Sequence, residues 1–352
     1  MLCIYTSLGG QLKVLLDLIK QHKKGANNGL YSVCSSHPLV LEAALKHALH
    51  SGEHVIIEAT SNQVNQDGGY TGHTPADFYT LVCRLADKVG VSLDKVILGG
   101  DHLGPNCWQD LPAEEAMAKS EELIASYVKA GFRKIHLDCS MSCADDPVPI
   151  GDKAVAQRAA RLCVIAEEAW KEVGGEPPVY IIGTEVPVPG GAQEGLDLLE
   201  VTSVDAANET IRVHYEAFTQ EGLANVWQRI IGLVVQPGVE FDHHKIISFE
   251  PEKAITLSQY IESDEHMVFE AHSTDYQSTG HLRALEKLIE NLNNSTPPLT
   301  MLSQYMPLQY QAVMEGTLSM DMREIIFHKV SYVLEQYSVA CAPAVDVETK
   351  EV

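Results

Sequence analysis

The segment Lys95-Val96-Ile97-Leu98-Gly99-Gly100-Asp101-His102 carries the pattern that decides the fold. A short run of apolar, β-forming residues ends in two glycines, and a carboxylate and an imidazole follow at once. Such a run is typical of a strand that is buried on both faces of a parallel sheet. Parallel α/β folds bind their ligands at the C-terminal ends of the strands. The segment therefore predicts both a strand and part of a site.

Six further runs of this kind occur along the chain, and helical stretches separate them. They cover residues 30–34, 54–58, 134–138, 179–183, 230–235 and 267–271. Glycines such as Gly52 and Gly90 follow the helical stretches at the positions where helices commonly end. Strands that alternate with helices in this way indicate βα units around a parallel sheet. Either a doubly wound sheet or a (β/α)₈ barrel is compatible with this pattern.

The polar residues that follow the runs distinguish these two folds. They occur after every run, from Ser35 and Ser36 after the first to His272 and Ser273 after the last. A barrel builds its site from the ends of all its strands, whereas a doubly wound sheet concentrates ligand contacts at one switch point. The sequence contains neither GxGxxG nor GxxxxGK[ST]. We therefore predict an α/β fold of the (β/α)₈ TIM-barrel type.

An eighth strand is difficult to place in the C-terminal part of the sequence. The segment after residue 271 is rich in Gln, Asn and Met, and residues 299–302 are its weak candidate. We expect the eighth strand to be shortened or missing, which would expose backbone groups on the first and seventh strands. Exposed strand edges promote association. We therefore expect residues 291–306 or a partner chain to cover the opening, and we expect an oligomer.

Two strand ends carry the residues with the most specific chemistry. Asp101 is a candidate for proton transfer, and His102 and His272 are candidate ligands of a divalent metal such as zinc. A third imidazole is expected from His243 or its neighbour His244, although the latter also fits a solvated face. Side chains alternate along a strand, so Asp101 and His102 cannot point in the same direction unless the backbone turns. We therefore predict that His102 binds the metal and that Asp101 does not. The structural alternative for this segment is a polar loop with a helix-capping Asp.

Glu185 precedes a loop that contains two prolines and then two glycines, which fits a movable active-site loop with an acid or base at its root. A rigid connection with a helix-capping Glu is the structural alternative. Other polar residues at the same strand ends are candidate substrate contacts, namely Glu58, Asn62, Asp138, Ser140, Gln236 and Ser273.

The charge balance of the chain argues against several classes of partner. The 48 acidic and 25 basic residues give a net charge of −23, which disfavours nucleic acid and anionic membrane surfaces. The eight cysteines are scattered through apolar segments of a long chain, which favours reduced thiols in the cytoplasm over a disulfide framework. The sequence shows neither an apolar run of membrane-spanning length nor the pattern of a signal peptide.

Seven long motifs resemble those of the GatZ/KbaZ family, the Z subunits of D-tagatose-1,6-bisphosphate aldolase. They are 32–38 (SVCSSHP), 58–66 (EATSNQVNQ), 99–108 (GGDHLGPNCW), 134–143 (KIHLDCSMSC), 182–191 (IGTEVPVPGG), 234–243 (VVQPGVEFDH) and 270–277 (EAHSTDYQ). The resemblance covers about residues 29–277 and resumes over about residues 291–341. The family acts in D-tagatose 6-phosphate degradation, within galactitol and N-acetylgalactosamine catabolism.

The resemblance implies a TIM barrel related to the zinc-dependent class II aldolases. It also implies a non-catalytic subunit that supports the activity and stability of a catalytic Y subunit. By similarity to class II aldolases, Asp101 corresponds to the catalytic acid/base, His102 and His272 to the first and last zinc ligands, and His243 lies near the middle ligand. Some relatives are described as ketose-phosphate 4-epimerases. An older description of the family is tagatose-6-phosphate kinase, but this sequence contains no loop of the kind that cradles phosphate in kinases.

The chain departs from the family in one place. Relatives carry several dozen additional residues before the SQY motif, and these include what resembles the eighth strand. We therefore expect a helical lead-in over residues 1–28, a barrel core with seven strands over 29–277, and a shortened region over 278–352. Two functions follow as hypotheses. The chain is either the partner subunit of a class II aldolase or a metal-dependent enzyme that performs retro-aldol cleavage or C4 epimerisation of a ketose phosphate alone.

Overall fold

Parallel strands form a closed barrel with the order β1-β10-β9-β6-β5-β4-β3-β2. The computed structural model describes residues 10–26, 29–184, 186, 199–241, 245–274, 276–288, 291–294 and 320–342. The barrel strands are β1 (Leu30–Cys34), β2 (Val55–Thr60), β3 (Val96–Leu103), β4 (Lys134–Leu137), β5 (Val179–Ile182), β6 (Ile230–Val235), β9 (Val268–Ala271) and β10 (Asn291–Asn294). A short antiparallel pair, β7 (Glu240–Phe241) and β8 (Ile246–Ile247), follows β6. The predicted TIM-barrel-like fold is confirmed.

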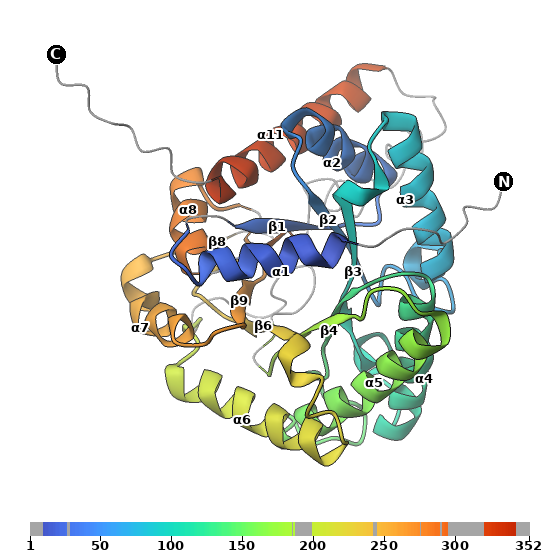
Figure 1. The fold of residues 1–352 in the computed structure, drawn as a ribbon, viewed down its shortest axis with the longest axis vertical. Helices are drawn as coiled ribbons and strands as arrows, with labels where there is room; N and C mark the ends of the chain where they lie inside the picture. Colours follow the sequence, from blue (N-terminus) through green and yellow to red (C-terminus); the bar gives the residue numbers. More distant parts are fainter. Residues whose placement is uncertain are drawn as a thin grey trace.

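Helices surround the barrel and cover the outer faces of its strands (Figure 1). They are α2 (Pro38–Ser51), α3 (Pro75–Val89), α4 (Ala113–Lys129), α5 (Asp152–Val173), α6 (Val204–Gln220), α7 (Pro251–Glu262), α8 (Thr279–Leu288) and α11 (Met320–Cys341). Local chemistry fixes their ends. The side chain of Thr74 caps α3 by accepting a hydrogen bond from the Asp77 amide, and Gly90 ends that helix with a φ of 89°. No helix in the described ranges is long and apolar enough to cross a membrane.

The eighth strand is present, although the sequence suggested that it is shortened or missing. Asn291–Asn294 pairs in parallel with β1 on one side and with β9 on the other. This strand has only four residues, so the expectation of a shortened or missing eighth strand is met by a short strand. Its Asn-Leu-Asn-Asn sequence has no apolar run, and its extended conformation follows from pairing with both neighbours. The earlier candidate, residues 299–302, lies outside the described residues.

An N-terminal helix, α1 (Gln11–His22), closes one end of the barrel. Its apolar side chains Leu12, Leu15 and Ile19 pack with interior strand residues such as Ile97 and Ile181 in one buried cluster. The carboxylate of Glu176 fixes the start of this helix by accepting hydrogen bonds from the amides of residues 10 and 12. The end of the barrel interior that α1 covers is thus apolar. Polar side chains lie further along the strands, toward their C-terminal ends.

Candidate metal centre

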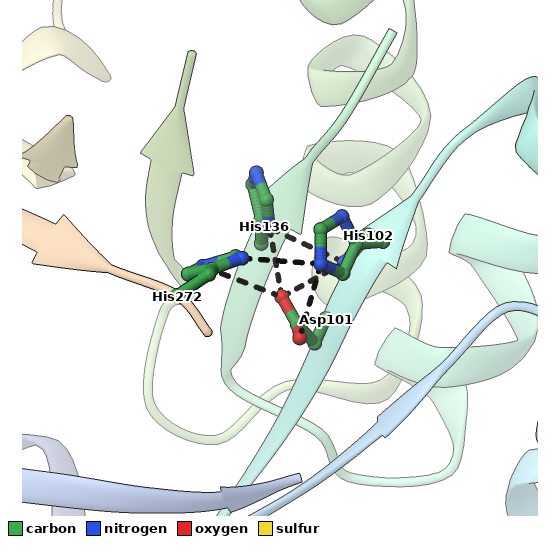
Figure 2. A group of neighbouring side chains, drawn as sticks. All are labelled: Asp101, His102, His136 and His272. Carbon is green, nitrogen blue, oxygen red and sulfur yellow. Dashed lines mark hydrogen bonds and ion pairs between the residues drawn. The ribbon is translucent and has the colours of Figure 1, made fainter. Parts of the chain in front are cut away.

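Four buried side chains meet at the C-terminal ends of the strands. Asp101 and His102 come from β3, His136 from β4, and His272 directly follows β9 (Figure 2). Each offers one ligand atom, and these atoms lie within 4.8 Å of one another. All four side chains are at most 2% exposed. The structure therefore brings together three residues that the sequence indicated and one that it did not.

A backbone irregularity in β3 places Asp101 and His102 in the same cluster. The register between β3 and β4 shifts between Gly100 and Leu103, and His102 has a φ of 47°, in the left-handed region. Such a conformation is uncommon for a residue with a side chain and is found preferentially at functional sites. The expected alternation assumed a regular strand and is interrupted at this position. Both side chains consequently face the cluster.

Two carboxylates orient two of the imidazoles. His102 Nδ1 lies 2.9 Å from Asp138 Oδ2, and His272 Nε2 lies 3.0 Å from Glu270 Oε1. Asp138 is itself held by Ser140, whose hydroxyl donates to Oδ1 over 2.6 Å. Carboxylates that accept a hydrogen bond from the far nitrogen of a metal-bound histidine are the usual second layer of a metal site. The remaining nitrogens, His102 Nε2 and His272 Nδ1, face each other at 3.1 Å.

His136 is the site residue that the sequence analysis missed. Its Nδ1 lies 2.8 Å from Asp101 Oδ1, and its buried Nε2 has no hydrogen-bond partner among the described residues. The signal was present in the strand Lys134-Ile135-His136-Leu137-Asp138. Alternation puts Lys134, His136 and Asp138 on one face, whereas Ile135 and Leu137 belong to the outer apolar core. Three polar residues on the inner face of a barrel strand indicate a site.

The cluster is strongly polarised. Burial would raise the pKa of Asp101, but the imidazoles of His102 and His272 hold it well below its usual range. Burial would lower the pKa of His102, but the carboxylates of Asp101 and Asp138 raise it to about 9. Burial lowers the pKa of His136 despite its contact with Asp101. The site thus favours a negatively charged Asp101 beside positive charge.

A second layer of charge lies beside the cluster in the barrel interior. Lys134 Nζ lies 2.8 Å from Glu58 Oε1 and 2.7 Å from Glu270 Oε2, and all three side chains are at most 1% exposed. Burial opposes the charge of Lys134, but Glu270 and Glu58 outweigh it and raise the pKa of this lysine. Burial raises the pKa of Glu58 to about 7, although Lys134 partly offsets it. Burial would raise the pKa of Glu270, but Lys134 and His272 lower it to about 2.

The donor set fits a divalent cation. If Asp138 and Glu270 each accept a hydrogen bond from a neutral imidazole, His102 Nε2 and His272 Nδ1 present lone pairs to each other, which requires a cation or an additional proton between them. Asp101, Asp138 and Glu270 place three carboxylates around these imidazoles, and a divalent ion would add to the positive charge that Lys134 sets against them. Imidazole and carboxylate ligands suit zinc and several other divalent ions. His102, His136 and His272 are the residues that would hold it, with Asp101 beside them.

Comparisons with known proteins give the family. The sequence model for "D-tagatose-1,6-bisphosphate aldolase subunit GatZ/KbaZ-like" matches residues 15–287 and 282–342. The chain belongs to the GatZ/KbaZ-like family. A crystal structure described as a probable tagatose 6 phosphate kinase from Sinorhizobium meliloti 1021 is 40% identical, with a TM-score of 0.70, and the match covers 89% of this chain and 85% of that one.

More distant aldolases share the fold of this GatZ/KbaZ-like chain. The YdjI aldolase from Escherichia coli K12 is 14% identical with a TM-score of 0.55, and the match covers 95% of this chain and 97% of that one. The fructose-bisphosphate aldolase Fba from Campylobacter jejuni is 17% identical with a TM-score of 0.55, and the match covers 95% of each chain. The predicted structural similarity to class II aldolases is therefore confirmed for the fold alone.

Several other predicted site residues have structural partners in this GatZ/KbaZ-like chain. Glu58 pairs with Lys134, and Asp138 and Ser140 orient His102, as described above. The side-chain oxygen of Gln236 accepts hydrogen bonds from the amides of Gly238 and Val239, which shapes the turn after β6.

Two of the remaining candidates lie in the described part of the chain, and two lie outside it. Asn62 is half-buried, and its backbone carbonyl accepts a hydrogen bond from the Tyr70 amide. Ser273 is buried beside His272 with a φ of 57°. Glu185 and His243 lie outside the described residues. The cluster thus obtains its third imidazole from His136 among the described residues, and the predicted role of His243 remains a prediction.

Proposed function

We propose that this chain is a component of a tagatose-bisphosphate aldolase, in which it works as the Z-type partner of a separate catalytic Y subunit. The family match over nearly the whole chain supports this proposal. The proposed location is the cytoplasm, where such sugar phosphates are degraded. Its role toward the Y subunit is to raise activity and stability.

Reconstitution tests the partner role directly. The cleavage of tagatose 1,6-bisphosphate by a purified Y subunit is measured with and without this chain, together with the melting temperature of the Y subunit. Heat-denatured chain at the same concentration is the control. We expect folded chain to raise both quantities. If neither changes at a tenfold molar excess, the partner role is wrong.

A second function, catalysis at this chain's own site, is favoured by one specific observation. Three imidazoles and a carboxylate converge in a buried layer at the strand ends, and two further carboxylates orient two of the imidazoles. A purely structural subunit has no physical need for such a set, because buried charges that lack full compensation are costly. We therefore propose metal-dependent retro-aldol cleavage or C4 epimerisation of a ketose phosphate as the alternative activity.

In the proposed reaction, different residues bind the ion, orient its ligands and transfer the proton. A bound divalent ion supplies Lewis-acid polarisation of the ketose carbonyl. His102, His136 and His272 hold that ion, while Asp138 and Glu270 fix two of the rings. The lowered pKa of Asp101 favours its carboxylate form, and its Oδ2 accepts a hydrogen bond from the Cys34 thiol over 3.2 Å. In the proposed reaction its carboxylate exchanges a proton with the C4 hydroxyl, as general acid/base chemistry requires.

Two assays separate this activity from the partner role and from phosphoryl transfer. The chain alone is incubated with zinc and either tagatose 6-phosphate or tagatose 1,6-bisphosphate, and products are identified by NMR. Asp101→Asn is the matched variant, and ATP is added in a parallel series. Product without ATP that disappears in Asp101→Asn supports the activity. Absence of product in the wild type removes it, and product only with ATP indicates a kinase.

A further inference from the structure

A buried chain of three charges connects the barrel interior to the candidate metal centre. Strand register places Glu58, Gly99 and Lys134 side by side on β2, β3 and β4. A Cβ atom at Gly99 would lie 2.3 Å from Glu58 Oε1, so only glycine leaves room for the carboxylate that reaches across to Lys134. The sequence thus provides space for this ion pair inside a close-packed barrel.

Glu270 joins this chain to the histidine cluster through its two oxygens. Oε2 contacts Lys134 Nζ at 2.7 Å, and Oε1 contacts His272 Nε2 at 3.0 Å. A carboxylate held at one oxygen by a fixed ammonium group has little freedom to rotate. The other oxygen then fixes the His272 ring, so that its Nδ1 faces His102 Nε2.

Stability alone does not account for these charges. Replacing a buried ion pair by apolar side chains of similar volume is often neutral or stabilising. The adjacent interior layer is apolar, with Ile97, Ile181 and Val268. We propose that Lys134 is a positioning residue, which sets the orientation and tautomer of the His272 imidazole through Glu270. This deepens the proposed metal function, but the positioning itself is present in the metal-free chain.

The first experiment uses the metal-free, full-length protein. Histidine is labelled with ¹⁵N, and the ring signals of His272 are assigned by comparison with His272→Gln. We expect one tautomer with a proton on Nε2 in the wild type. In Lys134→Met, which keeps the length of the side chain but removes its charge, we expect averaging between tautomers and faster exchange of that proton. Unchanged His272 signals in Lys134→Met would overturn the proposal.

The second experiment measures zinc affinity by competition with a chelator. We expect Lys134→Met to lose about 10- to 100-fold in affinity, the loss typical of residues that orient metal ligands. Arg229→Met is the matched control, because it breaks another largely buried pair, with Glu167 at 2.5 Å, that does not contact the histidine cluster. This control is expected to lower stability and to keep the zinc affinity of the wild type. Equal losses in both variants would indicate a general effect of stability and contradict positioning.

The two experiments distinguish failure of the positioning role from failure of the metal function. If the wild type binds no zinc, the metal function is wrong, and the metal-free NMR spectra still decide the role of Lys134. If Lys134→Met does not fold, Glu270→Gln carries the test, because Lys134 then keeps its pair with Glu58. We expect this variant to show the same averaging of the His272 tautomers, and a single Nε2 tautomer there would overturn the proposal.

Discussion

Replacing Gly99 with alanine is expected to destabilise the barrel by about 3 kcal/mol. The new methyl group would lie 2.3 Å from Oε1, 2.9 Å from Cγ and 3.0 Å from Cδ of Glu58. These distances are far below van der Waals contact, so the carboxylate must move away from Lys134. Breaking a buried pair costs about 3–5 kcal/mol. The lower value applies because Lys134 keeps Glu270 at 2.7 Å and because the pKa of Glu58 is about 7, which lets it take up a proton.

Urea unfolding at pH 7.5, followed by fluorescence and circular dichroism, measures this loss. Gly280→Ala is the control, because a Cβ atom there meets only Ser278 Oγ at 3.9 Å and the residue lies in helix α8. Alanine favours a helix over glycine by up to about 1 kcal/mol. The control variant should therefore be as stable as the wild type or slightly more stable.

A double variant tests the cause of the loss. Glu58→Ala removes the atoms that the new methyl group would contact, so adding Gly99→Ala to it should cost much less than in the wild type. The coupling free energy should exceed about 1 kcal/mol, as it does for residues in direct contact. A loss below about 1 kcal/mol for Gly99→Ala alone, or additive effects in the double variant, would refute the reasoning.

The other predictions concern the metal, a helix cap and acid stability. His102→Ala should abolish binding of a divalent ion, whereas Asp101→Asn should keep the ion and remove catalysis; elemental analysis decides, and equal loss of metal contradicts the assigned roles. Thr74→Ala should cost about 1 kcal/mol in urea unfolding, because it removes the cap of α3, whereas the mid-helix control Thr80→Ala should cost nothing. Burial lowers the pKa of His214 to about 4 from 6.5 in the unfolded chain, so the unfolded chain binds more protons between these values. Stability is therefore expected to fall by up to about 3 kcal/mol as pH drops from 6.5 to 4, and unfolding of His214→Gln across that range should show a correspondingly smaller loss.

The sequence predicted the strands where local chemistry determines them. The runs at 30–34 and 230–235 match β1 and β6 residue for residue, because short runs of mostly apolar, strand-favouring residues between helices have few alternatives in an α/β fold. Strand β10 could not be predicted in this way. Asn-Leu-Asn-Asn has no strand preference of its own, and its conformation depends on two neighbours that are distant in the sequence.

The candidate site was predictable where its residues directly follow the apolar strand runs, and not elsewhere. Asp101, His102 and His272 follow apolar runs, so their meeting at one end of the barrel follows from topology. His136 lies within its run and needed the alternation of Lys134-Ile135-His136 to be interpreted as an inner polar face. The shared direction of Asp101 and His102 was not predictable, since it depends on the left-handed backbone at His102.

The interior of this barrel changes from apolar at one end to charged and polar at the other, and this change in polarity bears on function. At the N-terminal end of the strands, α1 seals an apolar layer that stabilises the fold without any ligand. In the middle, Lys134 holds two carboxylates. At the C-terminal end, three imidazoles and the carboxylate of Asp101 gather with their ligand atoms within 4.8 Å of one another. A barrel retained only as a scaffold gains nothing from the last two layers, because apolar residues stabilise such positions at least as well. Both layers fit a cation with a fixed set of ligands, so the chemistry of the interior supports the proposal that this chain holds its own metal even if it works beside a catalytic partner.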